Sequence, residues 1–219
     1  MIRAVLFDLD GTFADTAPDL GLALNLLRES YGLLPLPHET IRPVASHGAR
    51  GLLELGFGSA PEQDDFNRLR NEFLRFYEDL QHRHSPLFPG MPEVLQQLRG
   101  QNRLWGIVTN KPARFTLPLM QALGLADDAA TVVSGDTCAQ PKPHPAPMLH
   151  ACNEMGLTPE QCLYIGDAER DIEAAHAAGM PALVAGWGYL SKDDQPENWG
   201  ADAIIAQPHD ILSYLLAHD

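Results

Sequence analysis

The stretch that decides the fold is Ala4-Val5-Leu6-Phe7-Asp8-Leu9-Asp10-Gly11-Thr12, near the start of the 219-residue chain. Its four apolar residues predict a buried strand of a parallel sheet. The strand ends in two carboxylates, Asp8 and Asp10, and open α/β sheets bind their ligands at the carboxyl ends of strands. Because adjacent carboxylates repel each other unless a cation joins them, the pattern indicates a divalent metal. One carboxylate then remains for nucleophilic or acid–base chemistry.

Three later segments carry polar residues in a related arrangement. The apolar run Leu104–Val108 leads into Thr109-Asn110-Lys111, and the apolar run Cys162–Ile165 leads, after one glycine, to Asp167. Between them, Lys142 lies between two prolines, which form a stiff frame for a long side chain. The first pair of acids is therefore followed, in chain order, by a hydroxyl, a loop lysine and a second acidic strand end.

These four segments, in this order, resemble the four motifs of the haloacid dehalogenase (HAD) superfamily. The resemblance extends over almost the whole chain. It implies an α/β fold, with a doubly wound parallel sheet as a Rossmann-like core and an inserted helical cap domain. It also implies a phosphoric monoester hydrolase that uses Mg²⁺ and acts on a small-molecule phosphate ester.

Alternating strand and helix patterns independently favour a doubly wound parallel sheet. The predicted strands are Arg3–Phe7, Leu104–Thr109, Thr131–Ser134, Leu163–Gly166, Ala182–Val184 and Ala203–Ile205. The helical patterns between them include Pro92–Arg99, Phe115–Leu123, Pro145–Met155 and Arg170–Ala178.

The region from about Thr16 to Ser85 has no clear strand pattern, and its apolar spacing indicates several helices. Its predicted helices are Asp19–Tyr31, Glu39–Val44, Ala49–Leu55 and Asp64–Gln81. We therefore expect a core domain of residues 1–15 and 86–219 and a cap domain of residues 16–85. Hinges near Asp15–Pro18 and His84–Pro89 would let the cap open and close over the site.

The resemblance also implies roles for the acidic residues. Asp8 would attack the phosphoryl group and form an aspartyl-phosphate, and Asp10 would serve as general acid and base. Asp8, Asp10 and Asp167 would hold Mg²⁺, with Asp171 supporting the site from behind.

The cations and hydroxyls complete the implied site. Thr109 would donate a hydrogen bond to a phosphate oxygen, and Lys142 would offset negative charge in the transition state. Asn110 and Lys111 would add a second donor and steer the anion. In the predicted cap, the polar break Ser46-His47-Gly48-Ala49-Arg50 offers His47 and Arg50 as contacts to a substrate carboxylate.

Composition narrows the possible partners and location. A formal charge of −14 argues against nucleic acid, which proteins bind by neutralising phosphates with Lys and Arg. No apolar run approaches the roughly 20 residues of a membrane span, so we expect no membrane partner. Three cysteines without metal-ligand spacing fit the reducing cytoplasm, where we expect the protein. The chain is expected to be a monomer or a homodimer.

Several functions of this superfamily remain open from the sequence. The motif segments resemble the phosphoglycolate phosphatase group, and Asn198-Trp199-Gly200-Ala201-Asp202 also resembles the N-acetylmuramic acid 6-phosphate phosphatases of cell-wall recycling. A phosphomutase of the same fold is a further alternative, although the cap loop has one arginine rather than a cluster of cations. Asp10 argues against a dehalogenase, which lacks this second acid. A non-catalytic binding module would have no reason to keep the four charged motif residues together.

Overall fold

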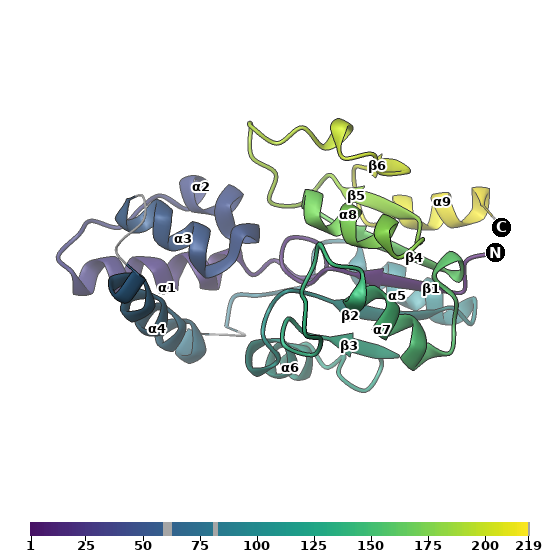
Figure 1. Cartoon of the computed structure of the whole chain (residues 1–219), viewed down its shortest axis with the longest axis horizontal. Helices are drawn as coiled ribbons and strands as arrows, with labels where there is room; N and C mark the ends of the chain where they lie inside the picture. The colour runs from purple at the N-terminus through teal and green to yellow at the C-terminus, as the bar shows by residue number, and fades with distance from the viewer. Residues whose placement is uncertain (59–62, 81–82, 219) are drawn as a thin grey trace.

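The protein, seen here as a computed structural model, is built around one parallel sheet of six strands. The structure describes residues 1–58, 63–80 and 83–218. The strand order across the sheet is β3-β2-β1-β4-β5-β6. The strands are β1 (Ala4–Phe7), β2 (Leu104–Val108), β3 (Thr131–Val133), β4 (Cys162–Gly166), β5 (Ala182–Ala185) and β6 (Ala203–Ile205). The order reverses its direction at β1, so the sheet is doubly wound as predicted (Figure 1).

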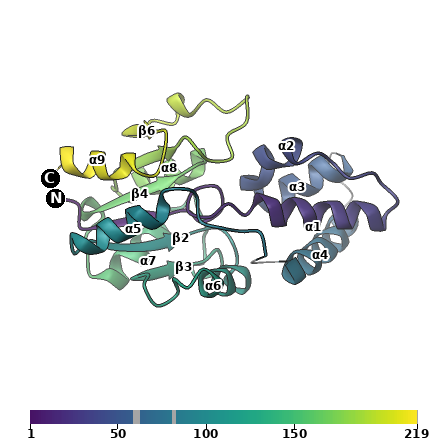
Figure 2. The same ribbon diagram turned by 180° about the vertical axis from the view of Figure 1, so that it is seen from behind.

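Helices cover both faces of the sheet (Figure 2). On one face lie α5 (Met91–Gly100), α6 (Ala113–Ala122) and α9 (Asp210–Ala217), and on the other lie α7 (Ala146–Met155) and α8 (Glu169–Ala177). The alternation of side chains along a strand divides the core accordingly: Val5 and Phe7 of β1 pack in the first cluster, while Ala4 and Leu6 pack in the second.

The strand register brings the motif residues to one edge of the sheet. Phe7, the last residue of β1, pairs with Ile107 of β2 on one side and with Ile165 of β4 on the other. The chain positions that follow these strand ends, Asp8 and Thr109 among them, therefore lie close together at the carboxyl edge. This is the edge at which the sequence predicts the site.

A group of helices lies beside the carboxyl edge, between β1 and α5 in the chain (Figure 1). They are α1 (Ala17–Ser30), α2 (His38–Ile41), the 3₁₀ helix η1 (Arg42–His47), α3 (Gly48–Phe57) and α4 (Gln63–Leu80). Their apolar side chains form a third core cluster. The two chain segments that join them to the sheet run together, since the Asp15 amide donates to the Pro86 carbonyl at 2.8 Å. The division of the chain into cap and core domains stays a prediction.

Most predicted elements end within two residues of the observed ones. The helix predicted over Glu39–Val44 is wrong in kind, because an α-helix of four residues is followed there by a 3₁₀ helix. Pro43 explains the change: it has no N–H to donate, and 3₁₀ geometry suits such short segments. The predicted end of the fourth helix, Gln81, lies outside the described residues. No helix among the described residues is long and apolar enough to cross a membrane.

Candidate active site

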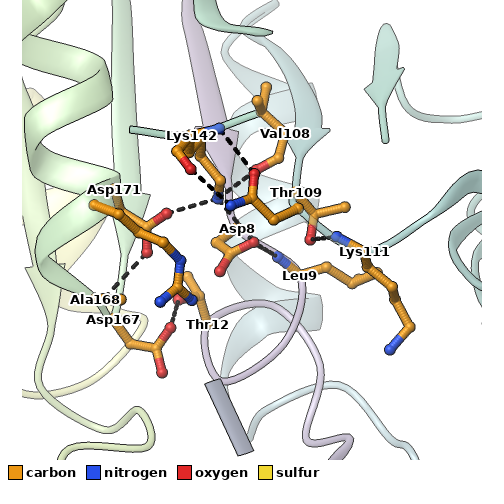
Figure 3. Close-up of polar contacts among 12 residues, drawn as sticks. Asp8, Leu9, Thr12, Val108, Thr109, Lys111, Lys142, Asp167, Ala168 and Asp171 are labelled. Carbon is orange, nitrogen blue, oxygen red and sulfur yellow. Dashed lines mark hydrogen bonds and ion pairs between the residues drawn. The ribbon is translucent and has the colours of Figure 1, made fainter. Parts of the chain in front are cut away.

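Asp8 occupies the centre of the site, directly after β1 (Figure 3). It is almost completely buried, and its amide donates to the Ile165 carbonyl of β4 at 2.9 Å. Its Oδ1 accepts a hydrogen bond from the Leu9 amide at 2.8 Å and pairs with the Lys142 ammonium at 3.0 Å. Within the described part of the chain, Oδ2 has no hydrogen-bond partner, and Asp8 lines a cavity. One carboxylate oxygen is thus held in place while the other is available to a ligand.

Lys142 links the two acidic strand ends. Its ammonium contacts the Asp8 carboxylate, the Asp171 carboxylate at 2.6 Å, the Tyr164 hydroxyl at 2.7 Å and the Val108 carbonyl at 3.0 Å. Its side chain is only 1% exposed. This lysine therefore places a buried ammonium group directly beside the carboxylates of Asp8 and Asp171.

Asn110 holds the loop that carries Lys142. Its side-chain amide donates to the Lys142 carbonyl, and its side-chain oxygen accepts from the Lys142 amide, both at 2.9 Å. Sequence reasoning expected this residue to donate to phosphate. The structure shows instead that both ends of its side chain are engaged by the backbone of the lysine loop. The phosphate contact stays a prediction.

Asp8, Asp167 and Asp171 form a compact acidic cluster. One carboxylate oxygen of each lies within 4.8 Å of the others, and all three residues are buried. Burial, together with the charges of Asp8 and Asp171, raises the pKa of Asp167 to about 7. Carboxylate oxygens are the ligands that Mg²⁺ prefers, and a divalent cation would relieve the repulsion among them. The residues present therefore fit a divalent metal.

Hydrogen bonds from nearby groups hold the carboxylates of Asp167 and Asp171 in place. Asp167 follows β4, and its carboxylate accepts hydrogen bonds from the Thr12 hydroxyl at 3.2 Å and the Tyr189 amide at 2.9 Å. Asp171 lies in the first turn of α8, where its second oxygen accepts from the Ala168 amide. Asp171 is thus committed to Lys142 and to the start of its own helix. This fits the predicted supporting position better than a direct ligand.

Asp10 lies apart from the acidic cluster. Its carboxylate pairs with the Lys111 ammonium at 2.8 Å and accepts a hydrogen bond from the Thr16 hydroxyl. Burial lowers the pKa of Lys111, but the Asp10 carboxylate outweighs it, and the net shift is upward. Lys111 also lies over the Tyr77 ring, with its ammonium 4.7 Å from the centroid. A metal contact from Asp10 stays a prediction.

A cavity of about 420 Å³ lies between the carboxyl edge of the sheet and the helices α1–α4. Asp8, Asp10 and Thr109 line it from the side of the sheet. The Thr109 hydroxyl accepts from the Lys111 amide at 3.2 Å, so its own proton is free for a ligand. From the helical side its lining includes apolar residues (Leu20, Ala45, Phe73, Leu74) and cationic residues (Arg50, Arg70). The cavity therefore has charged residues on the side of the sheet and both apolar and cationic residues on the side of the helices.

The two predicted substrate contacts of the cap loop lie at the rim. His47 and Arg50 both line the cavity and both are exposed. Arg50 is bound on its own helix, since its guanidinium pairs with Glu54 at 3.0 Å and its side chain is 81% exposed. Neither side chain contacts the acidic cluster, so their role as substrate contacts stays a prediction.

Sequence reasoning missed a direct connection between the helices and the acidic cluster. The Ser46 hydroxyl donates to Asp167 at 2.7 Å, and the Arg170 guanidinium donates to the Ser46 carbonyl at 2.7 Å. Arg170 also lines the cavity. The sequence could have indicated Arg170 as a site residue, because it directly precedes Asp171 at the start of a helix on the carboxyl edge. Apart from its place in the polar break between two predicted helices, nothing in the sequence indicated a contact from Ser46.

The chain resembles known proteins over most of its length. A family model described as haloacid dehalogenase-like hydrolase matches residues 5–185. An N-acetylmuramic acid 6-phosphate phosphatase of Pseudomonas putida is 42% identical over 210 residues, which cover 96% of this chain and 94% of the relative. A phosphoglycolate phosphatase of Xanthomonas campestris pv. campestris is 43% identical over 206 residues, covering 94% and 93%.

A solved structure supports the same assignment. The crystal structure of a predicted phosphoglycolate phosphatase from Haemophilus somnus superposes with a TM-score of 0.86 at 29% identity and covers 98% of each chain. The resemblance and the α/β fold expected from the sequence are thereby confirmed. The chain belongs to the haloacid dehalogenase-like hydrolases.

Proposed function

We propose that the protein is a Mg²⁺-dependent phosphatase that hydrolyses a phosphate monoester of a small anionic metabolite. The observation that carries this proposal is the position of Asp8: it lines the cavity, and one of its carboxylate oxygens is held by Lys142 and Leu9. A carboxylate in this position suits attack on phosphorus, which splits the hydrolysis into two easier steps. Phosphatase relatives that match over almost their whole length support the same reaction.

The residues around Asp8 have complementary tasks in this mechanism. Asp8 attacks the phosphoryl group, and an aspartyl-phosphate forms as the ester bond breaks. Lys142 neutralises charge on the oxygens nearest Asp8, and the Thr109 hydroxyl donates a hydrogen bond to a phosphate oxygen. Mg²⁺, held by Asp8 and Asp167 with Asp171 behind them, would supply charge neutralisation at the phosphoryl oxygens.

Asp10 serves as the general acid and the general base. Its carboxyl lies on the cavity wall, away from the acidic cluster, where it can reach the leaving oxygen. It donates a proton to that oxygen in the first step and removes one from the attacking water in the second. Lys111 keeps this carboxyl in position through the 2.8 Å ion pair.

Two carboxylate-bearing esters are the candidate substrates. Phosphoglycolate is the substrate named for several relatives, and N-acetylmuramic acid 6-phosphate is named for others. The size of the cavity and the apolar residues on its helical side favour the larger sugar ester, whose ring and acetyl group would displace water from these surfaces. A small two-carbon ester would leave most of this space hydrated.

Phosphate release from a panel of esters tests the proposal. The panel contains both candidates, several sugar 6-phosphates and β-glucose 1-phosphate, each with Mg²⁺ and with a chelator, and the Asp8→Asn variant as the blank. We expect Mg²⁺-dependent release that Asp8→Asn abolishes. Release that survives in this variant or in the chelator would contradict the proposal. Interconversion of sugar phosphates without release would instead indicate a phosphomutase.

A further inference from the structure

One face of α4 forms a wall of the cavity along its length. Arg70, Phe73, Leu74 and Tyr77 all line the cavity, and their spacing of three, four and seven residues places them on the same side of the helix. The end of this face nearest the sheet is fixed by Tyr77, which is buried and packs against Phe115 of α6 with a centroid distance of 5.4 Å. The ring of Tyr77 also lies beneath Lys111, the partner of Asp10.

Arg70 lies at the opposite end of the same face. The helical rise places its Cα about 10 Å from that of Tyr77 along the helix axis. Because helical side chains lean towards the N-terminus, its guanidinium extends further still from the reacting end. Figure 1 shows the C-terminal end of α4 directed towards the sheet, and Arg70 precedes Tyr77 by seven residues in this helix.

Arg70 differs from the other cavity arginines in its partners. Arg50 is paired with Glu54 at 3.0 Å, and Arg170 donates to the Ser46 carbonyl. Among the side chains that the structure describes, no acid lies within ion-pairing distance of Arg70. A guanidinium that lines a cavity and has no acidic partner among the described side chains is available for a carboxylate ligand, which it binds with two parallel hydrogen bonds.

We propose that Arg70 binds the carboxylate of the substrate, and that its separation from the reacting end selects esters whose carboxylate lies about a sugar ring away from the phosphate. This inference rests on the proposed phosphatase function and deepens it. Phe73 and Leu74, between the two charged ends, contact the uncharged body of such an ester. In phosphoglycolate a single carbon separates the ester oxygen from the carboxylate, so this ester cannot reach both ends at once.

Binding of two esters, with and without the lactyl ether that carries the carboxylate, tests the proposal without turnover. The probes are N-acetylmuramic acid 6-phosphate and N-acetylglucosamine 6-phosphate, which lacks the lactyl carboxylate. Calorimetric titration with Mg²⁺ uses the Asp8→Asn protein with and without Arg70→Gln. We expect the carboxylate ester to bind about tenfold more tightly than its analogue, and Arg70→Gln to remove this difference while leaving the analogue unchanged.

Two further arginine variants complete the test, and the first of them is a matched control. Arg75→Gln removes the same charge from the same helix at a residue outside the cavity, and it should leave both affinities unchanged. Arg50→Gln is a comparison and not a control, because Arg50 also lines the cavity and is a predicted contact to the substrate carboxylate. An equal loss for both probes in Arg70→Gln, a preference that disappears only in Arg50→Gln, or binding of neither probe would overturn the proposal.

The two proposals fail in distinguishable ways. If the wild-type protein releases phosphate from neither ester but the Arg70-dependent difference in binding is present, the phosphatase function fails and the assignment of Arg70 stands. If phosphate is released from both esters with equal kcat/KM and Arg70→Gln changes neither value, the function stands and the assignment of Arg70 is wrong.

Discussion

The hydroxyl of Ser46, on the helical side of the cavity, donates a 2.7 Å hydrogen bond to the carboxylate of Asp167, on the sheet side. The two residues are 121 positions apart in the chain. Asp167 belongs to the acidic cluster, so this contact ties the position of the helices to the candidate metal site. Arg170 strengthens the tie by binding the Ser46 carbonyl.

Ser46→Ala should weaken metal binding. The hydrogen bond from Ser46 favours the ionised form of Asp167, so its loss favours protonation, which competes with the metal. A hydrogen bond to a charged group contributes about 1.5–3 kcal/mol, so we expect the half-saturating Mg²⁺ concentration for phosphate release at pH 6.5 to rise about tenfold or more. Ser213→Ala, on the exposed side of α9, is the control. An unchanged Mg²⁺ dependence in Ser46→Ala would refute this connection.

Lys142→Met should abolish activity and also destabilise the fold. The substitution leaves the buried carboxylates of Asp8 and Asp171 without their common partner, at a cost of about 3–5 kcal/mol. Urea unfolding in chelator measures the loss. Lys192→Met, at an exposed position, should change the free energy of unfolding by less than about 0.5 kcal/mol. Equal stability of the two variants would show that the buried pairs contribute nothing.

Gly11→Ala should damage the acidic cluster, because a Cβ at this position would lie 2.1 Å from an Asp167 oxygen. Gly179→Ala is a matched control: its φ of +79° is close to the +83° of Gly11, but nothing lies within 4 Å of the added Cβ. Both variants should lose about 1–2 kcal/mol from the left-handed backbone. Only Gly11→Ala should also lose Mg²⁺-dependent activity, and similar activity in the two variants would argue against the close approach.

Without metal, stability should fall as the pH rises from about 4 to about 7. The pKa of Asp167 is raised to about 7 by burial and by its acidic neighbours, whereas an unfolded Asp has a pKa near 3.9. Across this range the folded protein keeps a proton that the unfolded chain has released, so each pH unit costs up to about 1.4 kcal/mol.

Urea unfolding at pH 5 and pH 8, in chelator and in Mg²⁺, measures this dependence. We expect the decrease in chelator to be reduced by Mg²⁺, which replaces the missing positive charge, and to be largely absent in Asp167→Asn. A free energy of unfolding that rises between pH 5 and pH 8 in chelator would contradict the charge arrangement of the acidic cluster.

The sheet and the positions of the motif residues could be predicted because they follow from local patterns. Buried parallel strands appear as short apolar runs, and each polar residue that ends such a run lies at the same edge once the strands pair. Asp8, Thr109 and Asp167 were therefore placed together without any knowledge of tertiary contacts.

Contacts between distant side chains could not be predicted in the same way. The binding of the Lys142 backbone by Asn110, and the link from Ser46 to Asp167, depend on how loops fold back over the sheet. The ion pair of Arg50 with Glu54 could not be predicted either, because a helical arginine can point to its own helix or to the cavity. The 3₁₀ segment around Pro43 could have been anticipated from the missing N–H of proline.

The central claim, that Asp8 carries the phosphoryl group, is tested most directly by trapping the covalent intermediate. The Asp10→Asn variant is mixed with p-nitrophenyl phosphate and Mg²⁺ and is then acid-quenched for peptide mass spectrometry. The leaving group of this ester needs no proton from Asp10, whereas the second step does need its base. The account predicts a burst of one p-nitrophenolate per protein and one phosphoryl group on the peptide that contains Asp8. Steady release of p-nitrophenolate with an unmodified Asp8 would contradict it.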